Sequence, residues 1–142
     1  MSVDLNVFLS CSQMPTPVRW AQAIADAGFD VQLGSDFDVD GFTGYLPCKN
    51  SGVDSGFEYF SGELSAADRE ELELGLPDSS DFSVTFCTRS DVREFMTSLI
   101  AAGVLCSISA GTLLDPQSGV SLQGDTVLDW VRSEIAACQD DL

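Results

Sequence analysis

Two hydrophobic periods alternate along the chain, and this restricts the fold to strands and helices joined by short connections. Near the N-terminus, Val3, Leu5 and Val7 alternate with polar residues in the pattern of a half-buried strand. Patterns of this kind predict strands at residues 3–10, 29–33, 42–48, 56–61, 82–87, 104–114 and 119–123. Apolar residues at helical spacing, together with capping signals, predict helices between Thr16 and Gly28, at 66–74, from Ser90 to Gly103 and from Asp125 to the polar tail 139–142.

This order of elements predicts the fold class. The connections are short, and neighbouring strands form local hairpins, one of which turns near residues 50–52. We therefore expect one α+β domain over residues 1–142, with a mostly antiparallel sheet and three to four helices packed mainly on one face. A hydrophobic share of 44% in 142 residues is enough for one compact core.

The chain is strongly acidic, with 23 Asp and Glu against 6 Lys and Arg and a formal net charge of −17. Thirteen aromatic residues supply a core, so the charge coats a folded domain rather than marking a disordered tail. Nucleic acids and anionic membranes are not expected as partners, because their phosphates require clustered Lys and Arg. A protein partner selected by long-range electrostatics would be basic.

Cysteine use and the N-terminal sequence predict a cytoplasmic protein. The five cysteines are widely spaced, without a C-x-x-C pair and without a histidine to complete a zinc site. The N-terminus lacks the basic and apolar regions of a secretory signal, and no apolar run approaches the roughly 18 residues of a membrane span. We expect reduced thiols and no bound metal or cofactor.

The lack of histidine also removes the usual catalytic arrangements. Ser-His-Asp and Cys-His sites cannot form within the chain, and its glycines form neither a dinucleotide fingerprint nor a phosphate loop. A non-catalytic protein is therefore expected. The alternative is a hydrolase that works through two carboxylates, for which Asp54 and Glu58 are the candidates.

A second alternative is a weak calcium or cation site in the acidic loop that follows the second strand. Asp36, Asp38 and Asp40, followed by Gly41, match the opening of a calcium-binding loop. The match then fails, because the twelfth position is Pro47 where such a loop needs a bidentate glutamate. A solvated acidic turn is the simpler interpretation, so no metal site is predicted.

The remaining candidate for function is an acidic, aromatic surface between the second strand and the end of the hairpin. Seven of the thirteen aromatic residues fall between Phe29 and Phe60, among several carboxylates. Exposed aromatic rings anchor interfaces, and acidic groups accelerate encounter with a basic partner. The predicted partner-binding residues are Asp36, Asp38, Asp40, Tyr45, Asp54, Glu58 and Tyr59. Two alternatives stay open: that helices bury all seven rings, and that an uncovered edge strand forms a homodimer.

Several segments resemble a group of small, acidic, mostly uncharacterised bacterial proteins. The segments include Ala27-Gly28-Phe29, Gly44-Tyr45-Leu46-Pro47-Cys48, Ser55-Gly56-Phe57-Glu58-Tyr59 and Phe86-Cys87-Thr88-Arg89-Ser90-Asp91, and the resemblance covers most of the chain. Proteins of this group are similar in size and charge to the acidic immunity proteins that neutralise bacterial toxins. The resemblance implies a binding protein that masks a basic partner such as a toxin, and it carries over no catalytic residue.

Overall fold

A computed structural model describes residues 2–34, 36–73 and 75–139. These residues form seven strands and four helices in one α+β domain, which confirms the predicted fold class. The strands are β1 (Val3–Leu9), β2 (Val31–Leu33), β3 (Gly44–Asn50), β4 (Val53–Glu63), β5 (Phe82–Thr88), β6 (Thr112–Asp115) and β7 (Val120–Gln123). The helices are α1 (Pro17–Asp26), α2 (Ala66–Leu72), α3 (Val92–Ser109) and α4 (Thr126–Cys138), and a short 3-10 turn η1 (Cys11–Gln13) follows β1.

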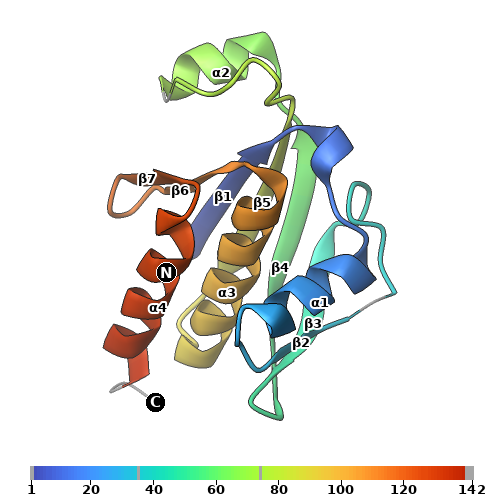
Figure 1. Cartoon of the computed structure of the whole chain (residues 1–142), viewed down its shortest axis with the longest axis vertical. Helices are drawn as coiled ribbons and strands as arrows, with labels where there is room; N and C mark the ends of the chain where they lie inside the picture. The colour runs from blue at the N-terminus through green and yellow to red at the C-terminus, as the bar shows by residue number, and fades with distance from the viewer. Residues whose placement is uncertain (1, 35, 74, 140–142) are drawn as a thin grey trace.

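The strands form one antiparallel sheet in the order β2-β3-β4-β5-β1-β6-β7. Helices α1, α3 and α4 lie on one face of this sheet, and none of the described helices covers the opposite face (Figure 1). Helix α2 stands apart, beyond one end of the sheet, in the connection between β4 and β5 (Figure 1). The core therefore lies between the sheet and three helices, and the opposite side is referred to below as the open face.

Side-chain alternation assigns each strand residue to one of these faces. In β5, Phe82, Val84 and Phe86 are buried under the helices. The residues between them are only half-buried and lie on the open face. The alternation seen in the sequence thus corresponds directly to the two sides of the sheet.

Trp20 of α1 lies at the centre of an aromatic cluster in the core. Its side chain is completely buried and contacts the rings of Phe37, Tyr59 and Phe86. The indole N–H donates a hydrogen bond to the carbonyl oxygen of Ala101 in α3 at 3.1 Å. Trp20 therefore connects α1 to both the sheet and the central helix.

Helix α3 is longer than predicted, and the strand expected at 104–114 is wrong over most of its length. The sequence pattern places the helix end at Gly103, but α3 continues to Ser109 and β6 begins only at Thr112. Gly103 lies where α4 crosses α3, and a Cβ atom there would overlap the side chain of Val131. Its small size permits close packing of the two helices; it does not end the helix.

Other boundaries differ by only a few residues. Asp91, rather than Ser90, caps α3, because its carboxylate accepts the hydrogen bond from a first-turn amide N–H. The β3–β4 hairpin turns through Ser51 and Gly52, both at positive φ, as expected for a two-residue connection.

The acidic helix between the strands has the predicted start. Ser65 and Asp68 form the expected capping box, each side chain accepting a hydrogen bond from the other residue's amide N–H. The helix ends at Leu72, two residues before its predicted end. Residue 74 and residues 140–142 of the predicted C-terminal tail lie outside the described residues.

Among the described helices, α3 is long and apolar enough to span a membrane by length and composition, although no such run was expected. Within its 18 residues, 67% are buried inside the protein. Packing on both sides, against α1 and α4, requires the same apolar composition.

The buried thiols predict a loss of stability at alkaline pH. Burial raises the pKa of Cys48 and of Cys106 to about 12, whereas unfolded thiols titrate near ~8.5. The stabilisation is complete below about pH 8.5 and is lost as the pH rises towards the folded pKa; by about pH 10 it falls by ~2 kcal/mol per thiol. Urea unfolding near neutral pH and at about pH 10 measures this loss. The Cys48→Ala/Cys106→Ala variant should lose less, and an equal loss in both proteins would contradict the prediction.

Candidate functional site

The structure divides the predicted partner-binding residues among separate places. The loop between β2 and β3 lies on the helix-covered side, because Phe37 and Phe42 pack against Tyr59 and Phe37 also contacts Trp20. The loop carboxylates are exposed to solvent at Asp36, Asp38 and Asp40. The aromatic residues of this loop are thus partly buried against the core, while its acidic residues face water.

Tyr59 was expected to contact a partner, and this expectation is wrong. Its side chain is 0% exposed, because alternation along β4 places it on the core face. The hydroxyl group donates a hydrogen bond to the carbonyl oxygen of Val39. Burial, followed by the charges of Asp40 and Asp38, raises the pKa of Tyr59. Tyr59 therefore anchors the acidic loop from inside.

Tyr45 and Glu58 lie on the open face, where the register of β3 and β4 pairs them. The Tyr45 side chain is 49% exposed, and its hydroxyl donates a hydrogen bond to Glu94 Oε2 at 2.7 Å. Burial of the hydroxyl and this bond raise the pKa of Tyr45. Glu58 forms an ion pair with Arg89 at 3.6 Å. Both side chains already have partners within the chain, and the sheet separates them from the acidic loop.

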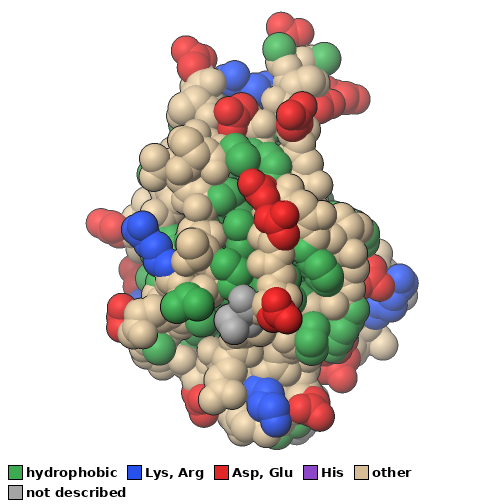
Figure 2. Space-filling view, turned by 90° about the vertical axis from the view of Figure 1, so that its right-hand side faces the viewer, with side chains coloured by type: hydrophobic (Ala, Val, Ile, Leu, Met, Phe, Trp, Pro, Cys, Tyr) green, Lys and Arg blue, Asp and Glu red, His purple; other side chains and the backbone are tan. Residues whose placement is uncertain are grey.

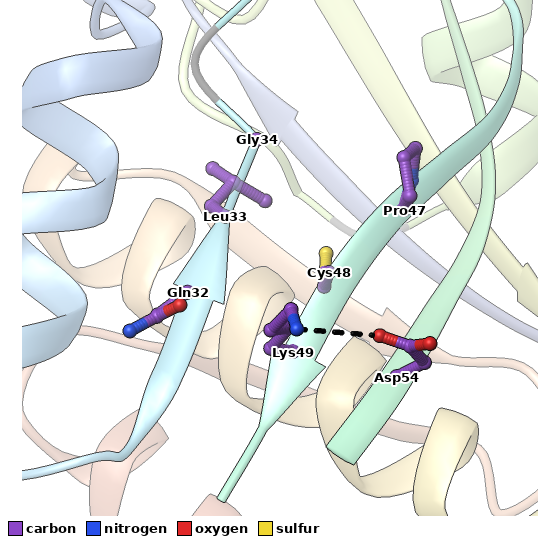
Figure 3. Close-up of a pocket in the computed structure, with 7 residues that line it drawn as sticks. All are labelled: Gln32, Leu33, Gly34, Pro47, Cys48, Lys49 and Asp54. Carbon is purple, nitrogen blue, oxygen red and sulfur yellow. Dashed lines mark ion pairs between the residues drawn. The ribbon is translucent and has the colours of Figure 1, made fainter. Parts of the chain in front are cut away.

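Asp54 lies at the opposite end of β4 from the acidic loop and pairs with Lys49 at 3.6 Å. The ion pair lies in a shallow hollow of about 340 Å³ lined by residues of β2, β3 and β4. Figure 3 shows Lys49 and Asp54 facing each other there. Asp54 and Glu58 are four residues apart on one strand, about 13 Å at about 3.3 Å per residue. The carboxyl groups of glycosidase pairs lie closer together, within about 5–9.5 Å, so these two residues are not placed as an acid/base pair.

The acidic loop does not assemble a cation site. Within residues 2–34, 36–73 and 75–139, no group of three or more Cys, Asp or Glu side chains is placed to hold a metal ion. Asp38 and Asp40 do approach each other, since a hydrogen bond from the protonated Asp40 carboxyl group to the Asp38 carboxylate, and the charge of Asp38, raise the pKa of Asp40. The amide N–H groups of Gly41 and Phe42 donate to the Asp38 carbonyl oxygen and close a turn. This arrangement gives the calcium alternative no support.

Three carboxylates instead converge in a cleft of about 480 Å³ where β4 ends and β5 begins. Asp40 comes from the acidic loop, Glu63 ends β4 and Asp81 precedes β5. Leu64 and Phe82 also line the cleft, although their side chains are only 9% and 5% exposed. This acid cleft is lined by Cys11, Asp40, Gly62, Glu63, Leu64, Asp81 and Phe82.

Hydrogen bonds fix the geometry of the acid cleft. The amide N–H of Leu64 donates to the Asp81 carbonyl oxygen at 2.9 Å, and the Asp81 amide N–H donates to the Leu9 carbonyl oxygen at 3.1 Å. The amide N–H of Cys11 donates to Asp81 Oδ1 at 2.8 Å. The ends of β1, β4 and β5 are therefore tied together around the carboxylates.

The potential in the acid cleft is negative. Burial raises the pKa of the Cys11 thiol, and the charges of Asp40, Asp81 and Glu63 raise it further. None of the four ion pairs found in the described residues includes these three carboxylates. Figure 2 shows acidic side chains beside a run of hydrophobic side chains on this side of the molecule. A carboxylate-lined hollow with apolar surface suits a Lys or Arg side chain, which has an apolar stem and a charged head.

Of the residues that line the acid cleft, only Asp40 was among the predicted partner-binding residues. Glu63 and Asp81 were missed because they are distant in sequence and lie outside the aromatic cluster. One signal was available: they flank the predicted acidic helix between two strands that were both recognised, and neighbouring antiparallel strands bring such flanks together. The register pairs Glu63 with Phe82, the residue that follows Asp81, and so brings the two carboxylates close together.

Asp81→Asn should make Cys11 more reactive towards iodoacetamide. The substitution removes one negative charge, which lowers the pKa of the thiol, and the asparagine carbonyl oxygen can still accept the hydrogen bond from the Cys11 amide. Because the thiolate is the nucleophile, modification at about pH 8 should be several times faster. Peptide mass spectrometry at successive times measures the rate. Asp30→Asn, which removes a charge outside the cleft, should leave the rate unchanged, and unchanged rates in both variants would contradict the prediction.

No family model matches the chain, and a comparison with curated proteins finds no match to it. The acid cleft and the charge of the chain are therefore the features that indicate a function.

Proposed function

We propose that the protein is a non-catalytic binding protein of the cytoplasm that masks a basic protein partner, in the manner of an immunity protein that neutralises a toxin. The observation that carries the proposal is the acid cleft, in which carboxylates from three segments converge beside apolar side chains. A Lys or Arg side chain of the partner would place its charge between Asp40, Glu63 and Asp81 and its stem along the wall of the cleft.

The charge of the whole chain supports the same proposal. Four of the six cationic side chains are already paired with carboxylates, at Lys49, Arg69, Arg89 and Arg132. The surface presented to an approaching molecule is therefore predominantly negative, which attracts a basic protein over distances of about a Debye length, ~8–10 Å.

Affinity capture from a lysate of the source organism tests the proposal. The immobilised full chain should retain a basic protein stoichiometrically at low salt and release it at high salt, because salt screens charge-led association. Mass spectrometry identifies the retained protein. The variant Asp40→Asn/Glu63→Gln/Asp81→Asn, which neutralises the acid cleft with minimal change of shape, should retain much less of it.

A matched variant separates the cleft from net charge. Asp26→Asn/Asp30→Asn/Asp125→Asn removes the same charge from the margins of α1 and α4 and should retain the protein as the wild type does. Circular dichroism and thermal melting of each variant establish that the fold is intact. Equal retention by the cleft variant and the matched variant would remove the cleft from the proposal, and retention of no protein by the folded wild type would contradict the function itself.

A further inference from the structure

The open face of the sheet carries very little of the chain's net charge. Alternation and register place four charged strand residues on it, Asp4, Lys49, Asp54 and Glu58. Lys49 pairs with Asp54 at 3.6 Å, and Arg89, just after β5, pairs with Glu58 at 3.6 Å. These residues sum to −1, or to −2 with Glu94, which holds the Tyr45 hydroxyl, against −17 for the whole chain. The negative charge therefore lies mainly on the other surfaces.

Polar side chains of the open face also have partners within the chain. The Thr85 hydroxyl donates a hydrogen bond to Asn6 Oδ1 at 2.8 Å, which links β5 to β1. Gln123 Nε2 donates to Thr112 Oγ1 at 2.8 Å, which links β7 to β6. Because these groups keep their hydrogen bonds when water is removed, covering this face costs less than covering unpaired polar groups.

Exposed aromatic rings stand on the same face, which none of the described helices covers (Figure 1). Phe60 is 39% exposed and Tyr45 is 49% exposed. In the register, Phe60 lies beside Thr85, in the middle of a row of small side chains at positions 83, 85 and 87 of β5. The face therefore has a raised ring next to a shallow row that a second ring could occupy.

We propose that the open face is the interface of a homodimer, in which the sheets of two copies of this chain pack face to face. Two copies that each carry −17 repel one another, and this repulsion is least where the facing charges are nearly balanced. A basic partner gains little attraction from this face, whereas a second copy meets it without facing a strongly acidic surface. The inference is independent of the proposed function, whose partner contacts the acid cleft.

A two-fold axis gives such a dimer matching contacts. An axis that lies in the interface, parallel to the strands and between β4 and β5, places each residue over the register partner of its counterpart. Because Phe60 pairs with Thr85, each Phe60 ring lies on the row of small side chains of the second copy. Packed sheets lie about 10 Å apart with their strands within about 30° of each other, a gap that aromatic rings can fill.

The area of the open face is sufficient for a stable dimer. The adjacent strands β3, β4, β5 and β1 have at least seven residues each, so they cover about 19 Å by about 23 Å at ~4.8 Å between strands and ~3.3 Å per residue. The shorter strands β2, β6 and β7 bring the flat area to about 600 Å². A specific interface buries about 600–1,000 Å² on each partner.

Sedimentation equilibrium of the full chain tests this inference. The wild type should sediment as a dimer at about 100 μM. Phe60→Glu removes the central ring and places two negative charges in the interface, so it should raise the dissociation constant of the dimer at least about tenfold. Val18→Glu makes the same change at a side chain that is 67% exposed on α1, outside the open face, and should leave the dissociation constant within about twofold of the wild type.

Circular dichroism and thermal melting establish that each variant is folded. If Phe60→Glu does not fold, Phe60→Thr replaces it, because threonine suits a strand, adds no charge and still removes the ring. A wild type that is monomeric at every concentration overturns the inference. A dimer that Phe60→Glu weakens no more than Val18→Glu forms through another surface, such as an edge strand, and also overturns it.

The salt dependence separates this dimer from the charge-led capture of a basic partner. High salt screens the repulsion between two acidic copies, so the dissociation constant of the dimer should fall as the salt concentration rises. Binding of a basic partner should weaken under the same change. A dimer that dissociates at high salt would contradict an interface whose own charges are nearly balanced.

Discussion

Replacing Trp20 with alanine is expected to lower the free energy of unfolding by about 3–5 kcal/mol. The side chain is 0% exposed and contacts three other rings, with the Phe86 ring edge-to-face at a centroid distance of 5.9 Å. Its removal leaves a cavity between α1, α3 and the sheet, and it leaves the Ala101 carbonyl oxygen without the indole N–H. Because domains of this size are stable by only about 5–15 kcal/mol, the variant should unfold at a much lower urea concentration.

Two further variants test this prediction, one at Trp20 itself and one at the second tryptophan. Trp20→Phe keeps an aromatic ring but loses the hydrogen bond, so it should cost less than the alanine variant. Trp130→Ala removes the second tryptophan, which lies half-buried on α4 at the margin of the core, and should also cost less. Urea unfolding followed by far-ultraviolet circular dichroism measures all three variants. A Trp20→Ala variant no less stable than Trp130→Ala would refute the central position assigned to Trp20.

The second large effect is expected for Gly56→Ala, at about 3 kcal/mol. Gly56 has φ +151°, and a Cβ atom there would lie 2.5 Å from the Leu46 carbonyl oxygen and 2.6 Å from Tyr45 Oη. The obstacle at Leu46 is backbone of the paired strand β3, so it cannot move aside without disturbing the hairpin. Glycine is needed here because the Tyr45 ring and the neighbouring strand both occupy the space of a side chain.

Gly52→Ala is the matched control for this prediction. Gly52 also has a positive φ, +79°, but no described atom lies within 4 Å of the added Cβ, so only the backbone strain of about 1–2 kcal/mol remains. Equilibrium unfolding of the two variants isolates the effect of crowding. In Tyr45→Ala/Gly56→Ala the contact with Leu46 persists, so most of the loss should persist as well. Equal stability of the Gly56 and Gly52 variants would show that hairpin crowding is unimportant.

Local sequence signals predicted much of the fold. The turn at Ser51-Gly52, the capping box at Ser65 and the alternation in β5 depend on residues within a few positions of each other, and all are present. The end of α3 was wrong because the role of Gly103 depends on Val131, a residue on another helix. A glycine at a helix end and a glycine at a helix crossing have the same local appearance in sequence.

The candidate site was less predictable for a related reason. Alternation along β4 separates Tyr59 from Glu58, but it does not show which of the two faces the helices cover. Both residues were nevertheless predicted to bind the partner, and Tyr59 is the one that lies in the core. The acid cleft depends on Asp40, Glu63 and Asp81. The consecutive strands β4 and β5 bring Glu63 and Asp81 together, but Asp40 comes from the loop between β2 and β3. That loop is held by tertiary contacts such as the hydrogen bond from Tyr59 to Val39, which have no signature in any one segment.

The order of strands in the sheet has a consequence for biosynthesis. β1 is synthesised before the other described strands, yet among them it pairs only with β5 and β6, so that Val3 meets Thr88 and Phe8 meets Thr112. During translation the β3–β4 hairpin can form at once, while β1 has no strand to pair with until more than half of the 142 residues have been made. Such non-local pairing slows folding and prolongs the exposure of a strand edge. The nascent chain therefore passes through a period in which a strand from the middle of the final sheet has both of its edges unpaired.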